Sequence, residues 1–405
     1  MKPIVRAGRM KPVHSDIRGP LFVEAMKRQK QGIDILKLNT GNPATFGFGL
    51  PDSIKNALME HMQDGVGYCD FKGMPQARQA ICDYETSKGI KGITPDDVFI
   101  GNGVSEVVSF ALTPLLNDGD EVLVPSPSYS LWGNSVYLED GKPVFYTCDE
   151  QANWYPDIQD IRSKITDKTK AIVIINPNNP TGVLYPKELL LEIIQVAREF
   201  GLLIFADEIY DRLVMDGKQH ISLASLTEDV PVITLNGLSK SHCLCGYRCG
   251  WMVISGPREL TEDYRQGIIQ LTSLRLCANT MAQIVIPAAL DDMDTPASMV
   301  RPGGRIYEQR EATVRELEKI NGLSFVKNDA AFYVFPKLGV KKFNITNDKQ
   351  FAHDLLDATN ILLVPGSGFD WKDPDHFRIV MLPQADILSD AIRRMGTFLD
   401  GYKQK

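Results

Sequence analysis

One lysine leaves an apolar segment and enters a stretch that is dense in reactive side chains. Lys240 follows the run "VITL" (232–235), and its segment "NGLSKSHCLCGYRCGW" (236–251) also holds one histidine, three cysteines and Arg248. An amine enclosed by apolar residues has a lowered pKa and can attack a carbonyl group to form a Schiff base. We therefore expect Lys240 to be a nucleophile with a lowered pKa in an apolar crevice.

The cysteines and the histidine of this segment allow two other hypotheses. Cys243, Cys245 and Cys249 have the spacing C-x-C-x3-C, which is not a common zinc motif, although His242 would supply a fourth ligand. Thiols beside a lysine would also allow a redox switch. The spacing favours a third interpretation, in which the cysteines are small apolar residues that fill space around the lysine.

Three further groups of polar residues each follow a short apolar run. The stretch "GNGVSEVV" (101–108) is typical of a phosphate-binding turn, and equally of a plain helix N-terminus. The dense loop "NPNNPTG" (176–182) is rigid enough to present Asn179 to a ligand. Asp207 directly follows "LLIFA", so its carboxylate either needs a cation or several donors, or caps a helix.

The apolar runs before these residues predict the strands that position them. Several of the runs lack polar alternation, which is typical of strands buried on both faces of a parallel sheet. Helical stretches separate them, and one (186–200) has apolar residues at helical spacing. We predict an α/β fold whose mainly parallel seven-stranded sheet uses residues 97–100, 121–124, 143–146, 171–175, 202–206, 232–235 and 251–254.

The rhythm of the sequence changes after about residue 285. A long charged helix (303–320) precedes short strands and a final amphipathic helix (385–399). We predict an N-terminal segment (1–48) that joins the small domain, a large cofactor-binding domain (49–285) and a small α+β C-terminal domain (286–405).

Composition and charge exclude several classes of partner. The net charge of −7 and the isoelectric point near 5.5 leave no basic surface for nucleic acid or for an anionic membrane. Seven cysteines form a poor disulfide framework, and no apolar run is long enough for a signal peptide or a membrane span. We expect a cytoplasmic protein.

In a parallel sheet the residues that follow the strands meet at one edge, where ligands collect. Together the four loops would offer an anion cradle, an amide, a carboxylate and an amine. Pyridoxal phosphate needs that set, for its phosphate, its ring oxygen, its pyridinium nitrogen and its aldehyde.

The ordered motifs "LNTGNPATFGF", "GYCDFKGMPQAR", "GNGVSE", "NPNNPTG", "FADEIYD", "NGLSKSHCLCGYRCGW", "DAAFYVFP" and "HFRIV" span essentially the whole chain. With them the chain resembles the class I/II pyridoxal-phosphate-dependent aminotransferases of fold type I. The stretches "DIRGP", "GYCD", "RLCAN" and "TPASMVRPGGRIYEQR" are similar to the bacterial glutamate–pyruvate (alanine) aminotransferases within that family.

The resemblance implies a role for each site residue. Lys240 holds the cofactor's aldehyde and later acts as the base, and Asp207 pairs with the pyridinium nitrogen. The ring oxygen accepts from Tyr210 and Asn179, and Asn179 also lies near the substrate carboxylate. Arg378, in "HFRIV", grips the α-carboxylate as a bidentate fork, and Gly41 lets the backbone approach the substrate.

The remaining implied contacts concern the ring face and the phosphate. Tyr129 stacks on the pyridine ring with Trp132 close by, and Tyr68 reaches the phosphate of a neighbouring subunit, which implies a homodimer. The phosphate is held by Val104, Ser105, Ser239 and Arg248.

The resemblance implies a ping-pong reaction in which L-alanine and 2-oxoglutarate give pyruvate and L-glutamate. Arg18, on a mobile N-terminal segment, is our hypothesis for the second carboxylate of glutamate. Two rival reactions on the same fold are transamination of aromatic amino acids and β-elimination from cysteine conjugates. A rival of another class is a regulatory protein that binds the cofactor without turnover.

Overall fold

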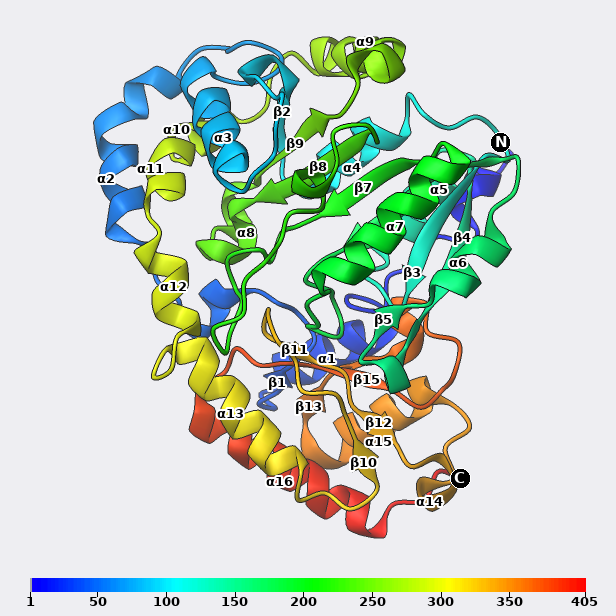
Figure 1. The fold of residues 1–405 in the computed structure, drawn as a ribbon. Helices are drawn as coiled ribbons and strands as arrows, with labels where there is room; N and C mark the ends of the chain where they lie inside the picture. Colours follow the sequence, from blue (N-terminus) through cyan, green and yellow to red (C-terminus); the bar gives the residue numbers. More distant parts are fainter. Residues whose placement is uncertain (1) are drawn as a thin grey trace.

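A computed structural model describes residues 2–405 and has one large sheet with helices on both faces (Figure 1). The strands lie in the order β2-β9-β8-β7-β6-β3-β4-β5. Their bounds are β2 Val98–Asn102, β3 Glu121–Ser126, β4 Lys142–Asp149, β5 Tyr155–Pro156, β6 Thr169–Ile175, β7 Leu203–Asp207, β8 Val232–Gly237 and β9 Cys249–Ser255.

All seven predicted strands are present in this sheet. The eighth strand, β5, pairs antiparallel with the end of β4. It was not predicted because its two residues are too few to form an apolar run. Strand β9 runs antiparallel to both of its neighbours, and the strands from β8 to β4 are parallel to one another. The predicted α/β class with a mainly parallel sheet is confirmed.

The helices precede, separate and follow these strands. Their bounds are α1 Pro20–Lys30, α2 Asp52–His61, α3 Pro75–Ser87, α4 Val104–Leu112, α5 Leu131–Leu138, α6 Ile158–Lys164, α7 Lys187–Phe200, α8 Leu238–Ser241, α9 Arg258–Arg275, α10 Thr280–Ile284, α11 Ile286–Asp291, α12 Asp294–Val300, α13 Arg305–Leu317, α14 Val340–Phe343, α15 Asp348–Thr359 and α16 Ala385–Gly401. Eight 3₁₀ turns complete the set: Gly8–Met10, Pro43–Phe46, Met62–Gly65, Pro95–Asp97, Glu150–Ala152, Leu223–Leu226, Cys245–Tyr247 and Gly366–Phe369.

The large sheet is buried on both faces, as its uninterrupted apolar runs predict. In β6, Ile172 and Ile174 pack in one cluster with α6 and α7, whereas Ala171, Val173 and Ile175 pack in another with α4, α5 and α9. Successive side chains of a strand point to opposite faces, so one strand contributes to both cores. Because helices cover both faces of the sheet, a ligand can reach it only at the ends of the strands.

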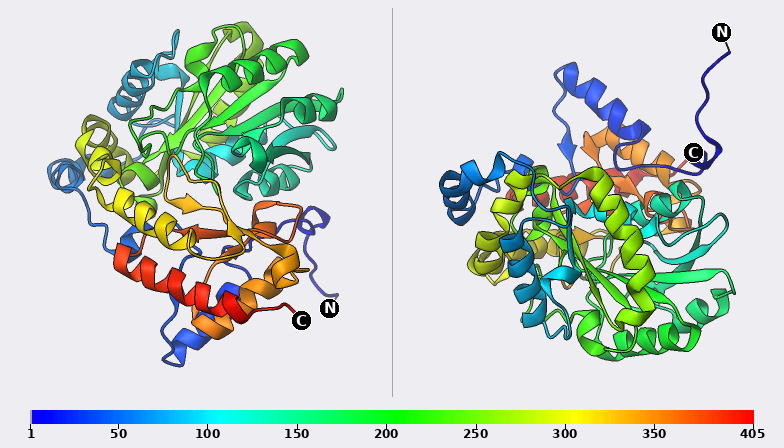
Figure 2. Two further views of the ribbon diagram at one scale, coloured as in Figure 1. Left: turned by 60° about the horizontal axis from the view of Figure 1, so that its bottom comes forward. Right: turned by 90° about the horizontal axis from the view of Figure 1, so that it is seen from above.

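The C-terminal part of the chain builds smaller sheets beside long helices. A three-stranded sheet has the order β11-β15-β14, with β11 Tyr333–Val334, β15 Phe377–Val380 and β14 Val364–Pro365. Strand β10 (Leu323–Ser324) pairs with β12 (Lys337–Leu338). Helices α13 and α16, which match the two helices predicted at 303–320 and 385–399, lie side by side along this part (Figures 1 and 2).

The N-terminal segment is attached to the C-terminal part. Strand β1 (Leu36–Lys37) pairs in parallel with β13 (Ile361–Leu362), and Ala25 of α1 packs in one cluster with Leu356 of α15. Figure 2 shows α1 beside the C-terminal helices and, before it, residues that extend away from the body. The domain boundaries at residues 48 and 285 stay a prediction.

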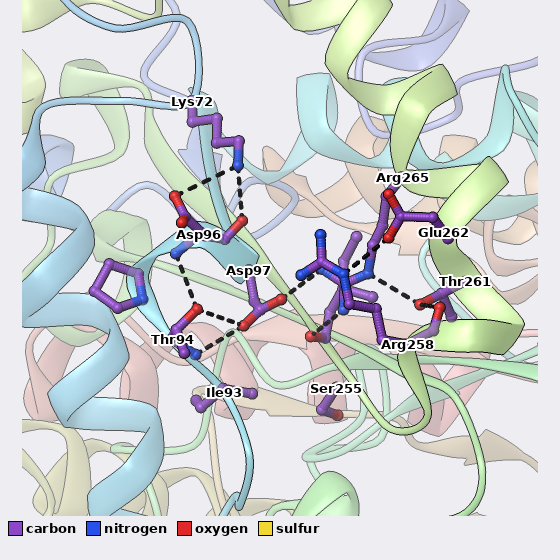
Figure 3. A network of polar contacts seen from close by, with 12 residues as sticks. Lys72, Ile93, Thr94, Asp96, Asp97, Ser255, Arg258, Thr261, Glu262 and Arg265 are labelled. Atoms are coloured by element: carbon purple, nitrogen blue, oxygen red, sulfur yellow. Dashed lines mark hydrogen bonds and ion pairs between the residues drawn. The ribbon is translucent and has the colours of Figure 1, made fainter.

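A buried ion pair ties Asp97, the residue directly before β2, to helix α9 (Figure 3). Arg265 Nη1 donates to Asp97 Oδ1 at 2.6 Å, and its Nη2 donates to the carbonyl oxygen of Ile254 in β9 at 3.0 Å. Asp97 also accepts from the backbone N–H and hydroxyl of Thr94. These bonds hold the residue before β2 against α9 and β9.

Among residues 2–405, no helix taken singly has the length and apolar composition needed to cross a membrane. The bent pair Arg258–Arg275 and Thr280–Asp291 meets that test only when its two helices are counted together.

Candidate active site

Lys240 lies on α8, the short helix that follows β8 at the open edge of the sheet. Its Nζ donates a hydrogen bond of 3.0 Å to the carbonyl oxygen of Gly41 and lies 5.8 Å from the centre of the Phe332 ring. Both contacts come from parts of the chain far from the lysine in sequence. The amine is therefore held by a neutral oxygen and an aromatic face.

The pKa of Lys240 corrects the sequence analysis, which expected it to be lowered. Burial does lower the pKa, but Tyr333, Cys245 and Tyr129 act in the opposite direction and outweigh burial, so the pKa is raised. The crevice that seemed apolar from the sequence thus also contains polar groups, namely two phenols and a thiol.

Asp207 is the last residue of β7, and its side chain is 5% exposed. Its Oδ2 accepts from the indole Nε1 of Trp132 at 3.0 Å, and its Oδ1 accepts from the backbone N–H of Ile209 at 3.4 Å. Burial raises the pKa of Asp207 to about 6, although both of these bonds act to lower it. A cation placed against this carboxylate would favour its ionised form.

Tyr210 and Tyr333 meet through their hydroxyl groups, which lie 2.8 Å apart. Both rings are buried, and they pack edge to face with 5.7 Å between centroids. A Cβ atom on Gly41 would collide with the Tyr333 hydroxyl and would lie 2.9 Å from the Phe332 ring. Gly41 is therefore required by the phenol that faces it.

Arg378, in β15, is 1% exposed and has no carboxylate partner among residues 2–405. Its Nη1 donates to the Asn179 Oδ1 at 2.9 Å, and its Nη2 donates to the carbonyl oxygen of Asn39. Its Nε is buried without a hydrogen-bond partner. The guanidinium lies 4.5 Å from the Tyr333 ring centre and 4.6 Å from that of Phe369. Burial lowers its pKa.

The two rings and two neutral oxygens around Arg378 leave its charge uncompensated. A buried guanidinium in such surroundings favours an anion, and its fork matches a carboxylate. Because Arg378 can only donate, it fixes the amide oxygen of Asn179 toward itself and leaves the amide nitrogen to donate elsewhere.

The turn between β2 and α4 has the geometry of an anion cradle. Gly103 has φ 84° and precedes Val104, the first residue of α4, so the first N–H groups of the helix have no helical partner. A Cβ atom on Gly103 would collide with the guanidinium of Arg248, which therefore lies beside this helix N-terminus. The structure brings Val104, Ser105 and Arg248 together as predicted residues of the site.

Two other predicted residues flank this group. Tyr129 is half-buried and influences the pKa of both Lys240 and Arg378, so its phenol lies near the two cations. Ser239 is the residue before Lys240, and its carbonyl oxygen accepts from the Cys245 thiol at 2.9 Å. Its hydroxyl has no hydrogen-bond partner among residues 2–405.

Tyr68 and Arg18 are not part of this group within one chain. Tyr68 is 84% exposed, and Arg18 is also exposed. Arg18 has an indirect link, because the carbonyl oxygen of Ile17 accepts at 2.8 Å from Asn39, the residue that holds Arg378.

The cysteines and His242 do not converge on a common point. His242 contacts the Ser241 hydroxyl and the carbonyl oxygen of Asp292, and Cys243 lies 3.9 Å from the sulfur of Met299. Burial raises the pKa of the Cys243 and Cys249 thiols to about 12. The groups of potential metal ligands within residues 2–405 are Glu24–His353–Asp357 and Glu208–Asp211–His220, neither of which includes a cysteine.

Sequence reasoning missed two residues of the site, Tyr333 and Asn39. Tyr333 lies inside the quoted motif "DAAFYVFP", and Asn39 lies inside "LNTGNPATFGF". Both motifs were noted, but neither residue follows a strand of the large sheet, so the rule about strand ends did not find them.

The residues fit pyridoxal phosphate at each of its polar groups. Lys240 is an amine with a neutral acceptor, Asp207 is a buried carboxylate without an ion-pair partner, and Arg378 has a buried Nε without an acceptor. The helix N-terminus beside Arg248 suits a phosphate. When bound, the cofactor supplies an electron sink for the substrate's Cα.

Comparison with known proteins identifies the family of the chain. The family model "Aminotransferase class I and II" matches residues 33–392. The chain belongs to this family; it is a transaminase, and its cofactor is pyridoxal 5′-phosphate.

Relatives and solved structures add detail. Glutamate-pyruvate aminotransferase AlaA of Haemophilus influenzae is 49% identical over 404 residues, which cover 100% of both chains. The crystal structure of an aminotransferase from Escherichia coli has a TM-score of 0.98 and 46% identity, with 100% of both chains covered. Alanine aminotransferase from Pyrococcus furiosus has a TM-score of 0.93 and 41% identity, covering 98% of this chain and 100% of that one. The predicted fold type I is confirmed.

Proposed function

We propose that this transaminase transfers the amino group of L-alanine to 2-oxoglutarate, giving pyruvate and L-glutamate by a ping-pong mechanism. The printed names of its relatives, glutamate-pyruvate aminotransferase and alanine aminotransferase, support this choice of substrates. The observation that carries the proposal is the buried, uncompensated charge of Arg378 beside Asn179. Both halves of the reaction use a 2-amino or 2-oxo acid, whose carboxylate that charge would bind.

We propose the following roles for the other residues of the site, and their positions support these roles. Asp207, held by Trp132, keeps a proton on the pyridinium nitrogen. Asn179 and Tyr210 donate to the ring oxygen, while Lys240 Nζ takes the proton from the substrate's Cα. Val104, Ser105, Ser239 and Arg248 hold the phosphate, and Tyr129 covers the ring.

The first test follows the visible absorbance of the holoenzyme as L-alanine is added without any oxo acid. We expect the band of the bound cofactor to bleach, one pyruvate to appear for each site, and 2-oxoglutarate to restore the band. The Lys240→Ala variant is the control, because it retains the pocket and lacks the base. If alanine leaves the band unchanged and an aromatic or sulfur amino acid bleaches it, the substrate assignment is wrong.

We propose that Arg18 binds the second carboxylate of glutamate. The support is its place beside Ile17, which contacts Asn39 next to Arg378. Arg18→Ala should raise the KM for glutamate and leave the KM for alanine, which has one carboxylate, near the wild-type value. Equal effects on both substrates would contradict this role.

We further propose a cytoplasmic homodimer in which Tyr68 reaches the phosphate of the partner's cofactor. Exposed apolar residues that an interface would bury occur in the same stretch of sequence as Tyr68, namely Met59, Met62 and Val66. Leu274 and Leu276 are also exposed, and Arg275 between them donates to the carbonyl oxygen of Phe71. The seven free cysteines are compatible with a reducing compartment.

A mixing experiment tests the shared site. We expect the Lys240→Ala and Tyr68→Ala variants each to have low activity, and co-refolding should put one of each in half of the dimers. A hybrid dimer has one site with both native residues, so activity should return to roughly a quarter of wild type. Failure to recover activity in hybrids of proven composition would show that Tyr68 serves its own subunit.

A further inference from the structure

Four charged side chains meet next to the start of β15, two residues from Arg378. His376 Nδ1 lies 2.6 Å from Asp375 Oδ1, and His376 Nε2 lies 3.5 Å from Glu150 Oε1. Lys337 Nζ completes the cluster at 2.8 Å from Glu150 Oε2 and 3.5 Å from Asp375 Oδ2. We call these residues the His376 cluster.

The His376 cluster joins two parts of the fold. Glu150 begins the 3₁₀ turn directly after β4, at one side of the large sheet, whereas Lys337 lies on β12 and His376 immediately precedes β15. The ring of His376 is fully buried, with Trp154 and Trp371 edge-on at 5.1 and 5.4 Å. The carboxylate of Glu150 thus links the large sheet to β15, the strand that carries Arg378.

The charges balance only when the imidazole carries a proton. Glu150 and Asp375 are two carboxylates, and Lys337 with protonated His376 supplies two cations. Deprotonation would leave one negative charge in excess in a largely buried cluster, which is costly at low dielectric. No other charged side chain within residues 2–405 forms an ion pair with these four.

The pKa shifts agree with this balance. Burial lowers the pKa of His376, but Asp375 and Glu150 outweigh burial and raise it above its ordinary value of 6.5. Burial raises the pKa of Asp375, yet His376, Trp371 and Lys337 together outweigh burial and lower it to about 2. The pKa of Glu150 is lowered in the same way by His376 and Lys337 against burial.

An aromatic layer connects His376 to Arg378. The His376 ring stacks on Phe335 with 4.9 Å between centroids and 18° between planes. Phe335 packs against Phe369 at 5.9 Å, and Phe369 lies under the guanidinium of Arg378 at 4.6 Å. A shift of the imidazole would therefore be passed to the guanidinium both along the strand and through these rings.

We propose that protonated His376 is a positioning residue: by bridging Asp375 to Glu150 it fixes the strand that carries Arg378 relative to the large sheet, and so sets the affinity for the substrate carboxylate. The proposal rests on the carboxylate-binding role of Arg378 in the proposed function. His376 itself touches no substrate.

The proposal makes the affinity for carboxylates depend on pH in a definite direction. A histidine whose folded pKa is raised contributes fully below pH 6.5, and its contribution is lost as the pH rises through the folded pKa. Carboxylate binding should therefore weaken above neutral pH. Glu150→Gln removes one negative charge, so the cluster then balances without the proton, and the pKa of His376 should fall.

The test measures the dissociation constant of propanoate, a carboxylate without an amino group, from the absorbance change of the holoenzyme between pH 5.5 and 9. In the wild type we expect the dissociation constant to rise about tenfold across the His376 transition. His376→Gln should bind about tenfold more weakly at low pH and lack the transition. Glu150→Gln, at a partly accessible side chain, should keep the transition and move it to lower pH.

His353→Gln is the matched control, because His353 also pairs with two carboxylates, Glu24 at 3.0 Å and Asp357 at 3.3 Å, on the exterior. It should leave the profile unchanged. A wild-type profile in His376→Gln, or an unmoved transition in Glu150→Gln, would overturn the proposal. If Arg378→Lys leaves propanoate affinity intact, the proposed function itself fails, which is a separate outcome.

Discussion

The indole of Trp132 and the carboxylate of Asp207 are joined by a buried hydrogen bond of 3.0 Å, from Nε1 to Oδ2, across 75 residues of sequence. Trp132 comes from α5 and Asp207 from the end of β7. The bond lowers the pKa of a carboxyl group that burial raises to about 6. Trp132 thus acts on the ionisation of Asp207, in addition to its place in the core.

Trp132→Phe should raise the pKa of Asp207 further and weaken cofactor binding. The change leaves a buried acceptor with one donor fewer, which costs about 1–3 kcal/mol. We expect the affinity for pyridoxal phosphate, measured by equilibrium titration of the cofactor-free protein, to fall about tenfold or more at pH 6 and less at pH 8.

The Trp251→Phe variant is its control, since that buried indole donates to Glu85 instead, at 3.2 Å. It should lose stability without a pH-dependent change in cofactor affinity. The prediction is wrong if both variants show the same pH profile.

Asp207 should destabilise the cofactor-free protein at neutral pH. Its pKa is raised from 3.8 to about 6, so between these values the folded state binds more protons than the unfolded state and stability falls as the pH rises. The effect is about 3 kcal/mol when complete. Urea unfolding at pH 4 and pH 7 should show a smaller loss of stability in Asp207→Asn than in the wild type. Parallel losses in both proteins would refute this.

Gly41→Ala should impair the site through Tyr333. The added methyl group collides with the Tyr333 hydroxyl and approaches the Phe332 ring, so the phenol must move from Tyr210. Overpacking of this kind costs about 1–3 kcal/mol, and we expect kcat/KM to fall at least tenfold. Gly246→Ala is the control, because a Cβ atom there meets nothing within 4 Å. Similar kinetics for the two variants would contradict the assignment.

Arg378→Lys should retain the positive charge and lose the two-pronged hydrogen bonding of the guanidinium group. A lysine cannot reach Asn179, Asn39 and a carboxylate together, so kcat/KM should fall by about 100-fold with the loss of charged hydrogen bonds. Arg301→Lys, on the exterior, should have no effect. The test is the steady-state kcat/KM for alanine. A decrease of less than threefold would show that Arg378 does not bind the substrate.

The strands of the large sheet and the residues that follow them could be predicted from the sequence. Apolar runs and their spacing are local properties, and the ends of parallel strands must meet at one edge. The sequence therefore predicts that Lys240, Asp207 and Asn179 lie at that edge, together with the turn before Val104. The two-residue strand β5 was missed because so short a segment has no pattern.

The electrostatics of the site and the hydrogen-bond partners of its residues depend on contacts between distant parts of the chain, so the sequence did not predict them. The lysine's hydrogen-bond acceptor, Gly41, is 199 residues away, and Asn39 is 339 residues from Arg378. The pKa of Lys240 is raised because Tyr333, Tyr129 and Cys245 surround it, and no window of sequence brings those groups together. Ionisation depends on the distances between charges, and folding alone sets these distances.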